Sequence, residues 1–446
     1  MTRSLHRAEW VVPVSAPPIH DGAVLVDDAR IAAVGTAGDL QRGDPLADVV
    51  DHGRSVILPG LVASHTHLEY ASYGGFGDGL SFGDWLADHI HRKRALDREA
   101  MLAGASLGAF ACVRSGVSAI GDCSFSGDAL VAASAAGLRG IVYLEAFGGG
   151  DPAPVVADLE RRLDGLAVDG LLALGISPHA PYSVSPEVYG ALIGEARRRG
   201  LRTATHVAES ADELEAVIDG AGPIAEAVAR IGGTVPRLAE HPLARLGRDG
   251  CLGPDVAVVH AVEIGPEEIG ILAAARSPVA HCPRSNAQLG CGAAPVRALL
   301  DAGVVVGLGM DSPASALSFD MFEEMRCAIW LARTRERSAT ALTADEALRM
   351  ATVGSARVLG LEDRCGSLES GKAADLTVLD LGSGAFWPVE DPIASIVYDG
   401  SPERVTMTMI AGVVRYGETE SARYAAALVS AAPGRAAMIE RATSTT

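Results

Sequence analysis

The stretch ILPGLVASHTHLEY, residues 57–70, begins as an apolar run and ends in a pair of histidines separated by one residue. The run predicts a buried strand with His65 and His67 at its end. In a strand, side chains two residues apart point to the same face, about 7 Å from each other. Two imidazoles aimed in one direction suit a metal ion, because neutral imidazole is a common metal ligand.

A second histidine pair, His89 and His91, has the same spacing in a different pattern. It lies in SFGDWLADHIHRKRALD, residues 81–97, where Leu86 and Ile90 fit a helical periodicity. Residues two apart on a helix diverge by about 200°, so this pair cannot hold one ion. We expect it to serve at the surface or in a substrate loop.

Composition restricts the class of protein. The chain has 446 residues, 48% hydrophobic and 21% charged, and a formal net charge of −19. The length allows about three average domains, or one large barrel with an accessory domain. The negative charge argues against nucleic-acid backbones and anionic membranes as partners, since both require clustered Lys and Arg.

The cysteines and the N-terminal segment predict a cytoplasmic protein. Seven cysteines, an odd number with no CxxC, fit a reduced interior better than a disulfide framework. The first residues lack the charged head and long apolar core of a secretory signal, and no apolar stretch of about 18 residues predicts a membrane span. The sequence leaves the oligomeric state open, with a homodimer as one candidate.

The two ends of the chain have a β-rich pattern. Residues 1–56 form short alternating segments that predict a small antiparallel unit, and residues 365–420 resume this pattern. Because chain termini often lie close together, we expect both parts to combine into one small discontinuous β-sandwich. Residues 421–446 predict a terminal helix and a tail.

Residues 57–364 alternate apolar β-rich runs with helical stretches. There are eight such runs, and the first overlaps the stretch quoted above. They are 55–64, 117–123, 139–147, 171–179, 201–207, 255–260, 278–282 and 304–311. Apolar strands alternating with helices indicate a parallel sheet covered on both faces, here an α/β fold of the (β/α)8 TIM-like barrel class. The alternative is an open doubly wound sheet, but no GxGxxG turn follows the first strand.

Polar residues gather at the ends of these runs, where a barrel has its active site. They are His65, His67, His179, His206, Glu209, His260, His281 and Asp311. Three imidazoles with a carboxylate form a mixed nitrogen and oxygen set that suits zinc or iron. Each residue also has a structural interpretation: Asp311 could cap the next helix, and His206 could be a satisfied core histidine.

Several motifs in order carry a resemblance that covers nearly the whole chain. LPGLVASHTHLE, HVAES, HCPRSN, GMDSPAS and the long segment EALRMATVGSARVLGLEDRCGSLESGKAADLTVLD together resemble the deaminase and chlorohydrolase branch of the amidohydrolase superfamily. TADE, residues 343–346, is also a capping box that predicts the start of a helix.

The resemblance implies one divalent metal ion, zinc in most members and iron(II) in some. The implied ligands are His65, His67, His206 and Asp311. The metal activates water for attack on an amidine carbon of a heteroaromatic ring. The resemblance implies that Glu209 shuttles the proton, His260 orients the water and Asp311 accepts its proton. His281 and Ser312 are expected to support these groups from behind.

Within this branch, HIHRKRALD and SPHAPYSVS resemble the aminodeoxyfutalosine deaminases of menaquinone biosynthesis. Their substrate joins an adenine nucleoside to a carboxyphenyl ketone. The resemblance implies that His179 contacts the substrate, and we expect Glu69 to bind the ribose hydroxyls. A basic residue among Arg92, Lys93 and Arg94 is expected to bind the carboxylate. The alternative for these basic residues is a solvated helix face.

Other activities of the same branch remain open. The alternatives are a deaminase of methylthioadenosine, S-adenosylhomocysteine, guanine or a triazine, and a chlorohydrolase. A catalytically inactive barrel scaffold is a more remote alternative.

Overall fold

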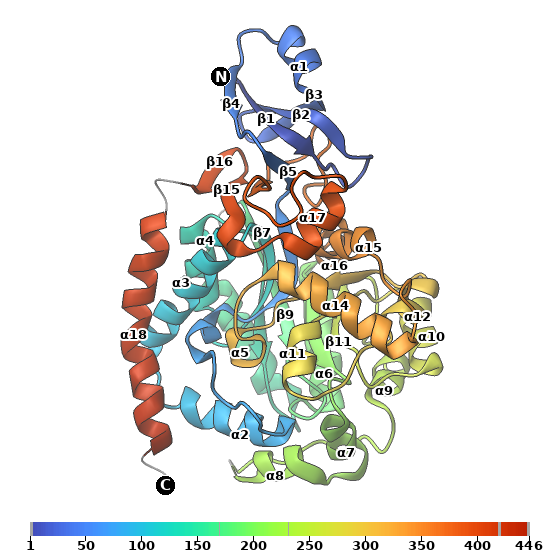
Figure 1. Ribbon diagram of the computed structural model, residues 1–446. Coiled ribbons are helices and arrows are strands. Elements are labelled where there is room, and N and C mark those ends of the chain that lie inside the picture. The colour runs from blue at the N-terminus through green and yellow to red at the C-terminus, as the bar shows by residue number, and fades with distance from the viewer. Residues whose placement is uncertain (1–2, 169, 231, 418–420, 444–446) are drawn as a thin grey trace.

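The computed structural model describes residues 3–168, 170–230, 232–417 and 421–443, and within them the chain forms two eight-stranded sheets (Figure 1). Of the tail expected after the terminal helix, residues 444–446 lie outside the described residues. All seven cysteines are unpaired. None of the helices in the described part of the chain combines the length and the apolarity needed to cross a membrane.

One sheet is a barrel of parallel strands that follow one another in chain order. Its strands are β6 (Leu61–Thr66), β7 (Val117–Ser124), β8 (Arg139–Ala146), β9 (Leu172–Pro178), β10 (Thr203–Val207), β11 (Val256–His260), β12 (Val279–His281) and β13 (Val306–Leu308). The ring closes between its first and last strands, where Met310 donates a 2.9 Å hydrogen bond to the His65 carbonyl. The predicted (β/α)8 barrel is confirmed.

Helices cover the outside of the barrel. They are η1 (Leu68–Tyr73), α2 (Phe82–Lys93), α3 (Arg98–Arg114), α4 (Asp128–Ala136), α5 (Pro152–Asp164), α6 (Pro186–Arg199), α7 (Ala211–Asp219), α8 (Gly222–Arg230), α9 (Pro242–Arg248), α10 (Pro266–Ala275), α11 (Pro283–Gln288), α12 (Val296–Asp301), α13 (Pro313–Ala316), α14 (Met321–Glu336), α15 (Ala344–Arg349), η2 (Met350–Gly354) and α16 (Ser355–Leu359). The predicted capping box is present at α15, where Thr343 and Glu346 each bond the other's backbone N–H.

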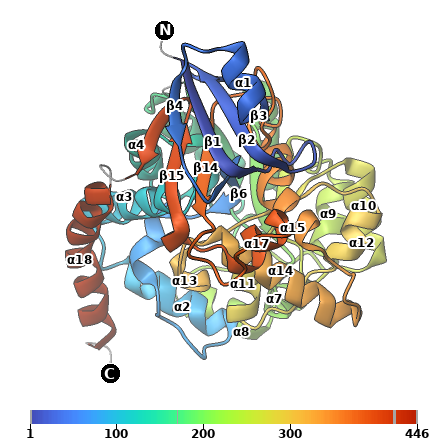
Figure 2. The ribbon, with the colours of Figure 1, turned by 45° about the horizontal axis from the view of Figure 1, so that its top comes forward.

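The second sheet joins the two ends of the chain. Its strands are β1 (Arg3–Val11), β2 (Ile19–Asp27), β3 (Arg30–Thr36), β4 (Asp48–Asp51), β5 (Ser55–Pro59), β14 (Leu376–Asp380), β15 (Val405–Ile410) and β16 (Val413–Tyr416). The antiparallel pair β5–β14 links the N-terminal and C-terminal parts. The unit expected to be antiparallel over residues 1–56 is mixed: β1–β2 and β2–β3 are antiparallel, but β1 pairs in parallel with both β4 and β5. Figure 2 shows this terminal sheet in front of the barrel.

Three further helices and one turn of helix complete the fold. They are α1 (Ala37–Gly43), α17 (Pro392–Asp399), η3 (Pro402–Arg404) and the C-terminal α18 (Ser421–Thr443). In both ribbon views α18 runs along the side of the molecule beside α3 and ends near α2 (Figures 1 and 2). Contacts between α18 and the segment before α2 include a hydrogen bond of 2.6 Å from the Arg435 guanidinium to the Ser72 carbonyl.

The single strand expected over residues 55–64 is two strands, β5 of the terminal sheet and β6 of the barrel. The chain changes sheet at Gly60, whose amide donates a 2.9 Å hydrogen bond to the Asp375 carbonyl. A side chain at Gly60 would meet the Ser118 hydroxyl at 2.3 Å, so only glycine fits this crossing. The terminal sheet thus lies against the amino ends of the barrel strands. The carboxyl ends, with the histidines, face the other way.

Candidate metal centre and active site

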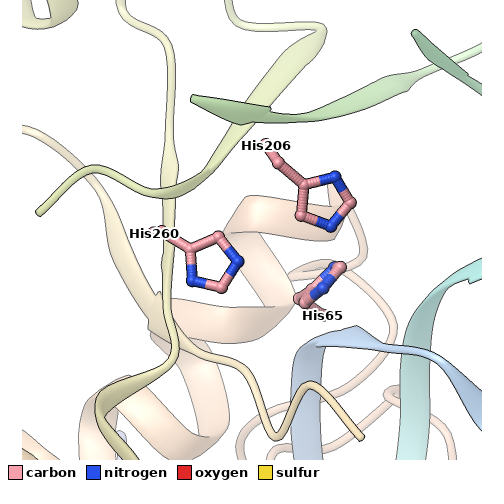
Figure 3. Close-up of side chains that lie close together, drawn as sticks. All are labelled: His65, His206 and His260. Atoms are coloured by element: carbon pink, nitrogen blue, oxygen red, sulfur yellow. The ribbon is translucent and has the colours of Figure 1, made fainter. Parts of the chain in front are cut away.

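The structure brings together side chains from four barrel strands that are distant in sequence. His65 lies in β6, His206 in β10 and His260 at the end of β11, and one ring nitrogen of each lies within 4.8 Å of the others (Figure 3). His67 and Asp311, which follow β6 and β13, form a second such group with His65. Parallel strands place their carboxyl ends at one edge, and the closed barrel turns that edge into a ring.

The hydrogen bonds of His67 and His206 fix the tautomer of both rings. The Nδ1 atom of His67 lies 2.7 Å from the Cys123 carbonyl, and that of His206 lies 2.9 Å from the His179 carbonyl. A carbonyl only accepts, so both Nδ1 atoms carry hydrogen and donate. In the neutral rings both Nε2 atoms therefore present lone pairs, and these two atoms are 3.2 Å apart. Lone pairs at that separation repel each other unless a cation lies between them.

Asp311 supplies a negative charge to the same point. Its Oδ2 accepts hydrogen bonds from Ser285 at 2.7 Å and Ser315 at 2.8 Å. Its Oδ1 faces the Nε2 atoms of His65 and His67, at 3.9 and 3.8 Å. Because two hydroxyls hold Oδ2, Oδ1 remains available to coordinate a metal ion.

The charge balance of the cluster favours a cation. His65 is fully buried, and its Nε2 has no hydrogen-bond partner. Burial lowers the pKa of His206 to about 4, so this imidazole is neutral at neutral pH. Burial also lowers the pKa of His67, but the carboxylates of Glu145 and Asp311 outweigh it and raise the pKa overall. The raised pKa shows that the nearby carboxylates favour a positive charge at His67. When that ring has lost its second proton, three nitrogens and one carboxylate oxygen match the donor set of a zinc or iron(II) site.

Glu209 and His260 lie beside this cluster and close to each other. The Asn286 amide group donates to Nδ1 of His260 at 3.0 Å, so Nε2 of His260 carries the hydrogen. That Nε2 lies 3.4 Å from Oε1 of Glu209. Burial, with Asp311 and Glu213 nearby, raises the pKa of Glu209 well above its ordinary value. A raised pKa favours the protonated carboxyl, which is the form that a proton donor needs.

Backbone strain accompanies the site. His260 and Asp311 have φ values of 75° and 49°, in the left-handed region that residues other than glycine rarely adopt. Ala208, between His206 and Glu209, has a φ of 54°. Glu213 holds this turn by accepting from the amides of Ala208 and Glu209, at 3.0 and 2.8 Å. Such strain is common where a fold positions functional groups.

A cavity of about 530 Å³ opens above the cluster. Its polar lining residues include His67, His179, His206, Glu209, His260, Asp311 and Ser312, which the sequence predicted for the site. Phe82, Trp85 and Leu86 of α2 form an apolar wall. An apolar cavity with a few convergent polar groups at one end is the usual form of a small-molecule site.

The structure does not bring every predicted substrate residue to this cavity. Among Arg92, Lys93 and Arg94, only Lys93 lines it. The expectation for Arg92 is therefore corrected: its guanidinium bonds the Asp88 carboxylate at 2.6 Å and the Met438 carbonyl at 3.3 Å. Arg94 is exposed at the end of α2, outside the lining. A helix turns about 100° per residue, so three neighbours cannot share one face.

Glu69 and His281 also lie outside the lining. The carboxylate of Glu69 accepts from the hydroxyls and amides of the turn at residues 124–126, with the shortest bond to Ser124 at 2.6 Å. It has no free oxygen for a ribose, so that expectation is corrected. His281 is buried behind the cluster at the end of β12.

Sequence reasoning missed three residues of the site. Glu145 of β8 lines the cavity, and its carboxylate lies within 4.8 Å of ring nitrogens of His67 and His206. Glu213 accepts hydrogen bonds from the amides of Ala208 and Glu209, and Asn286 donates one to His260. Glu145 sits at a strand end in RGIVYLEAF, so its position could have revealed it. Nothing local distinguishes Glu213 from other helix carboxylates.

Known proteins that are similar to this chain include several deaminases. A sequence model of the amidohydrolase family matches residues 56–415. A 5-methylthioadenosine/S-adenosylhomocysteine deaminase from Moorella thermoacetica is 34% identical over 415 residues, which span 91% of this chain and 92% of that protein. A 5′-deoxyadenosine deaminase from Methanopyrus kandleri is 33% identical over 412 residues, 90% of this chain and 91% of that protein.

Among solved structures, an adenosine deaminase from Xanthomonas campestris with bound zinc is similar over its whole length. The TM-score is 0.86 at 29% sequence identity, and the match covers 98% of this chain and 99% of that one.

Proposed function

The chain belongs to the amidohydrolase family, and on that basis we propose that it is a metal-dependent hydrolase that deaminates the adenine ring of a nucleoside. The relatives named above act on adenine nucleosides. The observation that carries the proposal is the buried Glu209, whose pKa is raised by burial, beside His260 at the edge of a histidine and aspartate cluster. In this arrangement the acid would lie next to the metal ion that we propose, at the end of an apolar cavity.

We propose that His65, His67, His206 and Asp311 hold one divalent ion, with zinc as the first candidate and iron(II) as the second. The zinc of the Xanthomonas campestris relative supports this assignment. The ion supplies Lewis acidity that makes water a nucleophile at neutral pH. The tautomers fixed by the carbonyls of Cys123 and His179 keep two ligand nitrogens unprotonated.

Protein side chains supply the proton transfers. The protonated carboxyl of Glu209 gives its proton to a ring nitrogen as the water oxygen bonds to the amidine carbon. Asp311 accepts a proton from that water, and the Nε2–H group of His260 orients the attacking oxygen. Asp311 then returns its proton to the exocyclic nitrogen, whose bond to the carbon breaks, and the nitrogen leaves as ammonia. The new hydroxyl becomes a carbonyl as its proton passes to Glu209, which restores the protonated carboxyl.

Within this activity we propose aminodeoxyfutalosine as the substrate. The support is the resemblance of the segments around α2 and His179 to deaminases of that compound. His179 lines the cavity, and its ring packs 4.7 Å from that of Phe147, between centroids. A nucleobase could bind against these rings. The substrates of the relatives, methylthioadenosine, S-adenosylhomocysteine and 5′-deoxyadenosine, are the alternatives.

Ammonia release and metal content test the proposal together. Purified protein should contain about one zinc or iron ion per chain by elemental analysis. It should release ammonia from aminodeoxyfutalosine faster than from adenosine, 5′-deoxyadenosine or S-adenosylhomocysteine. Metal-loaded protein that releases no ammonia from any nucleoside would overturn the proposed function. Halide release from a chlorotriazine without nucleoside turnover would favour the chlorohydrolase alternative.

A further inference from the structure

Lys93 is the only lysine or arginine that lines the cavity within the described residues. It is the last residue of α2, and it is partly buried. The acidic groups of the lining are Glu145, Glu209 and Asp311. The cavity thus has one fixed positive charge outside the cluster that we assign to the metal.

The ammonium group of Lys93 has no ion-pair partner among the residues that the structure describes. Its Nζ lies over two aromatic rings instead, 3.8 Å from the centroid of Phe125 and 5.8 Å from that of Tyr70. Burial lowers the pKa of this ammonium, and the more distant carboxylates of Glu145 and Glu69 only partly offset that effect. A partly desolvated charge without a partner is unfavourable until an anion reaches it.

Neighbouring basic residues differ in this respect. Arg92 is bound to Asp88 and to α18, and Arg94 is exposed. Arg92 therefore has a structural role, whereas Lys93 lines the cavity and pairs with no carboxylate of the described residues.

The surroundings of Lys93 also limit the kind of anion. Tyr70, Trp85, Phe125 and Phe147 give this part of the lining flat apolar surfaces. A single ammonium matches the single charge of a carboxylate. A phosphate monoester would carry about two charges into a cavity that already holds three carboxyl groups.

We propose that Lys93 determines substrate specificity by binding a carboxylate on the nucleoside's 5′ substituent, remote from the amine. This inference rests on the proposed deaminase activity and deepens it. It assigns the recognition of the acid to one residue of α2.

A matched pair of substrates tests the inference. The first substrate is aminodeoxyfutalosine, and the second is its methyl ester, which has the same rings without the charge. Wild-type zinc enzyme should show a kcat/KM about 10- to 100-fold higher for the acid, because charge-assisted hydrogen bonds are the stronger ones. The difference should lie in KM, since the carboxylate is remote from the reacting carbon. Adenosine 5′-monophosphate should be a poor substrate.

Substitutions at Lys93 should remove this preference selectively. Lys93→Met should lower kcat/KM for the acid to the value for the ester and leave the ester within about threefold. Lys93→Arg should retain most of the preference. Arg94→Met is the matched control, because it removes a charge from the next residue, outside the cavity, and should keep the preference in full.

A binding measurement separates recognition from turnover. Calorimetry on zinc-loaded Glu209→Gln protein should show the acid binding about 10- to 100-fold more tightly than the ester, and Lys93→Met should abolish the difference. Equal binding of acid and ester, or equal losses for both substrates in Lys93→Met, would overturn the role of Lys93. Turnover of nucleosides without any acid preference would overturn this inference alone. No turnover of any nucleoside would overturn the proposed function.

Discussion

Two pairs of histidines in this protein have nearly the same geometry and different chemical meanings. In the terminal sheet, Nδ1 of His6 lies 3.1 Å from Nε2 of His52. At the barrel mouth, the Nε2 atoms of His67 and His206 lie 3.2 Å apart. The distance alone does not distinguish the two pairs.

The partner of the remaining ring nitrogen makes the difference. Nε2 of His6 faces the Ser4 hydroxyl at 3.0 Å, and a hydroxyl can donate as well as accept. His6 can therefore keep its hydrogen on Nδ1 and donate it to His52 as an ordinary hydrogen bond. In their neutral forms His67 and His206 each donate their one ring hydrogen to a carbonyl, so neither can donate to the other. The first pair is complete within the protein, and the second requires a cation.

Matched substitutions in the two pairs should give the largest contrast. His206→Gln should lose the metal and lower kcat/KM by about 10⁴-fold, because metal catalysis supplies several kcal/mol. His52→Gln, the control, should keep both metal content and kcat/KM within about threefold. Elemental analysis and ammonia release measure both variants. Full metal content in His206→Gln would show that the pair is a hydrogen bond like the other one.

Glu209→Gln should separate metal binding from proton transfer. The amide cannot give up a proton as the raised-pKa carboxyl does, so kcat should fall by about 10³-fold. Metal content should stay at the wild-type level, since Glu209 is not among the proposed ligands. Turnover like that of the wild type would remove Glu209 from the mechanism.

Ser285→Ala should have a smaller effect on the same cluster. Ser285 donates to Oδ2 of Asp311 at 2.7 Å and so helps to direct Oδ1 toward the histidines. Loss of such a supporting bond should weaken metal affinity by about 10- to 100-fold. A chelator competition measures this affinity. An unchanged affinity would mean that Ser315 alone holds the carboxylate.

The pair His6 and His52 of the terminal sheet should affect the stability of the protein rather than catalysis. Burial and the nearby His52 lower the pKa of His6 to about 4, below the value of about 6.5 in the unfolded chain. His6 is neutral when folded, so its contribution is present at pH 7 and is lost as the pH falls from 6.5 toward 4. Between pH 7 and pH 5 the free energy of unfolding should fall by about 2 kcal/mol through this group.

Urea unfolding of wild-type protein and His6→Phe at the two pH values measures that term. The variant should be less sensitive to pH by this amount. Equal sensitivity of the two proteins would contradict the lowered pKa.

Sequence patterns were sufficient for much of the architecture. The eight apolar runs gave the barrel strands, since strands buried on both faces must be apolar throughout. The exception is the first run, where Gly60 splits one apolar segment between two sheets. Residues 55–64 are apolar in either arrangement, so local pattern could not reveal the crossing.

The helical periodicity of α2 distinguished the pair His89 and His91 from the pair His65 and His67. It correctly predicted that His89 and His91 lie on a helix. The buried position of His89 in the cavity lining was not determined by that period. Likewise, the run HIHRKR predicted a basic residue near the substrate but did not single out Lys93.

The sequence by itself determined the barrel, the terminal sheet built from both chain ends and the residues at the strand ends. These follow from periodicity and from the order of the motifs, which are local properties of the chain. The tertiary structure alone decided which nitrogen of each histidine is free, which oxygen of Asp311 remains available and which basic side chain of α2 enters the cavity. Those outcomes depend on hydrogen-bond partners such as Cys123 and Ser285, which reach the site only when the barrel closes.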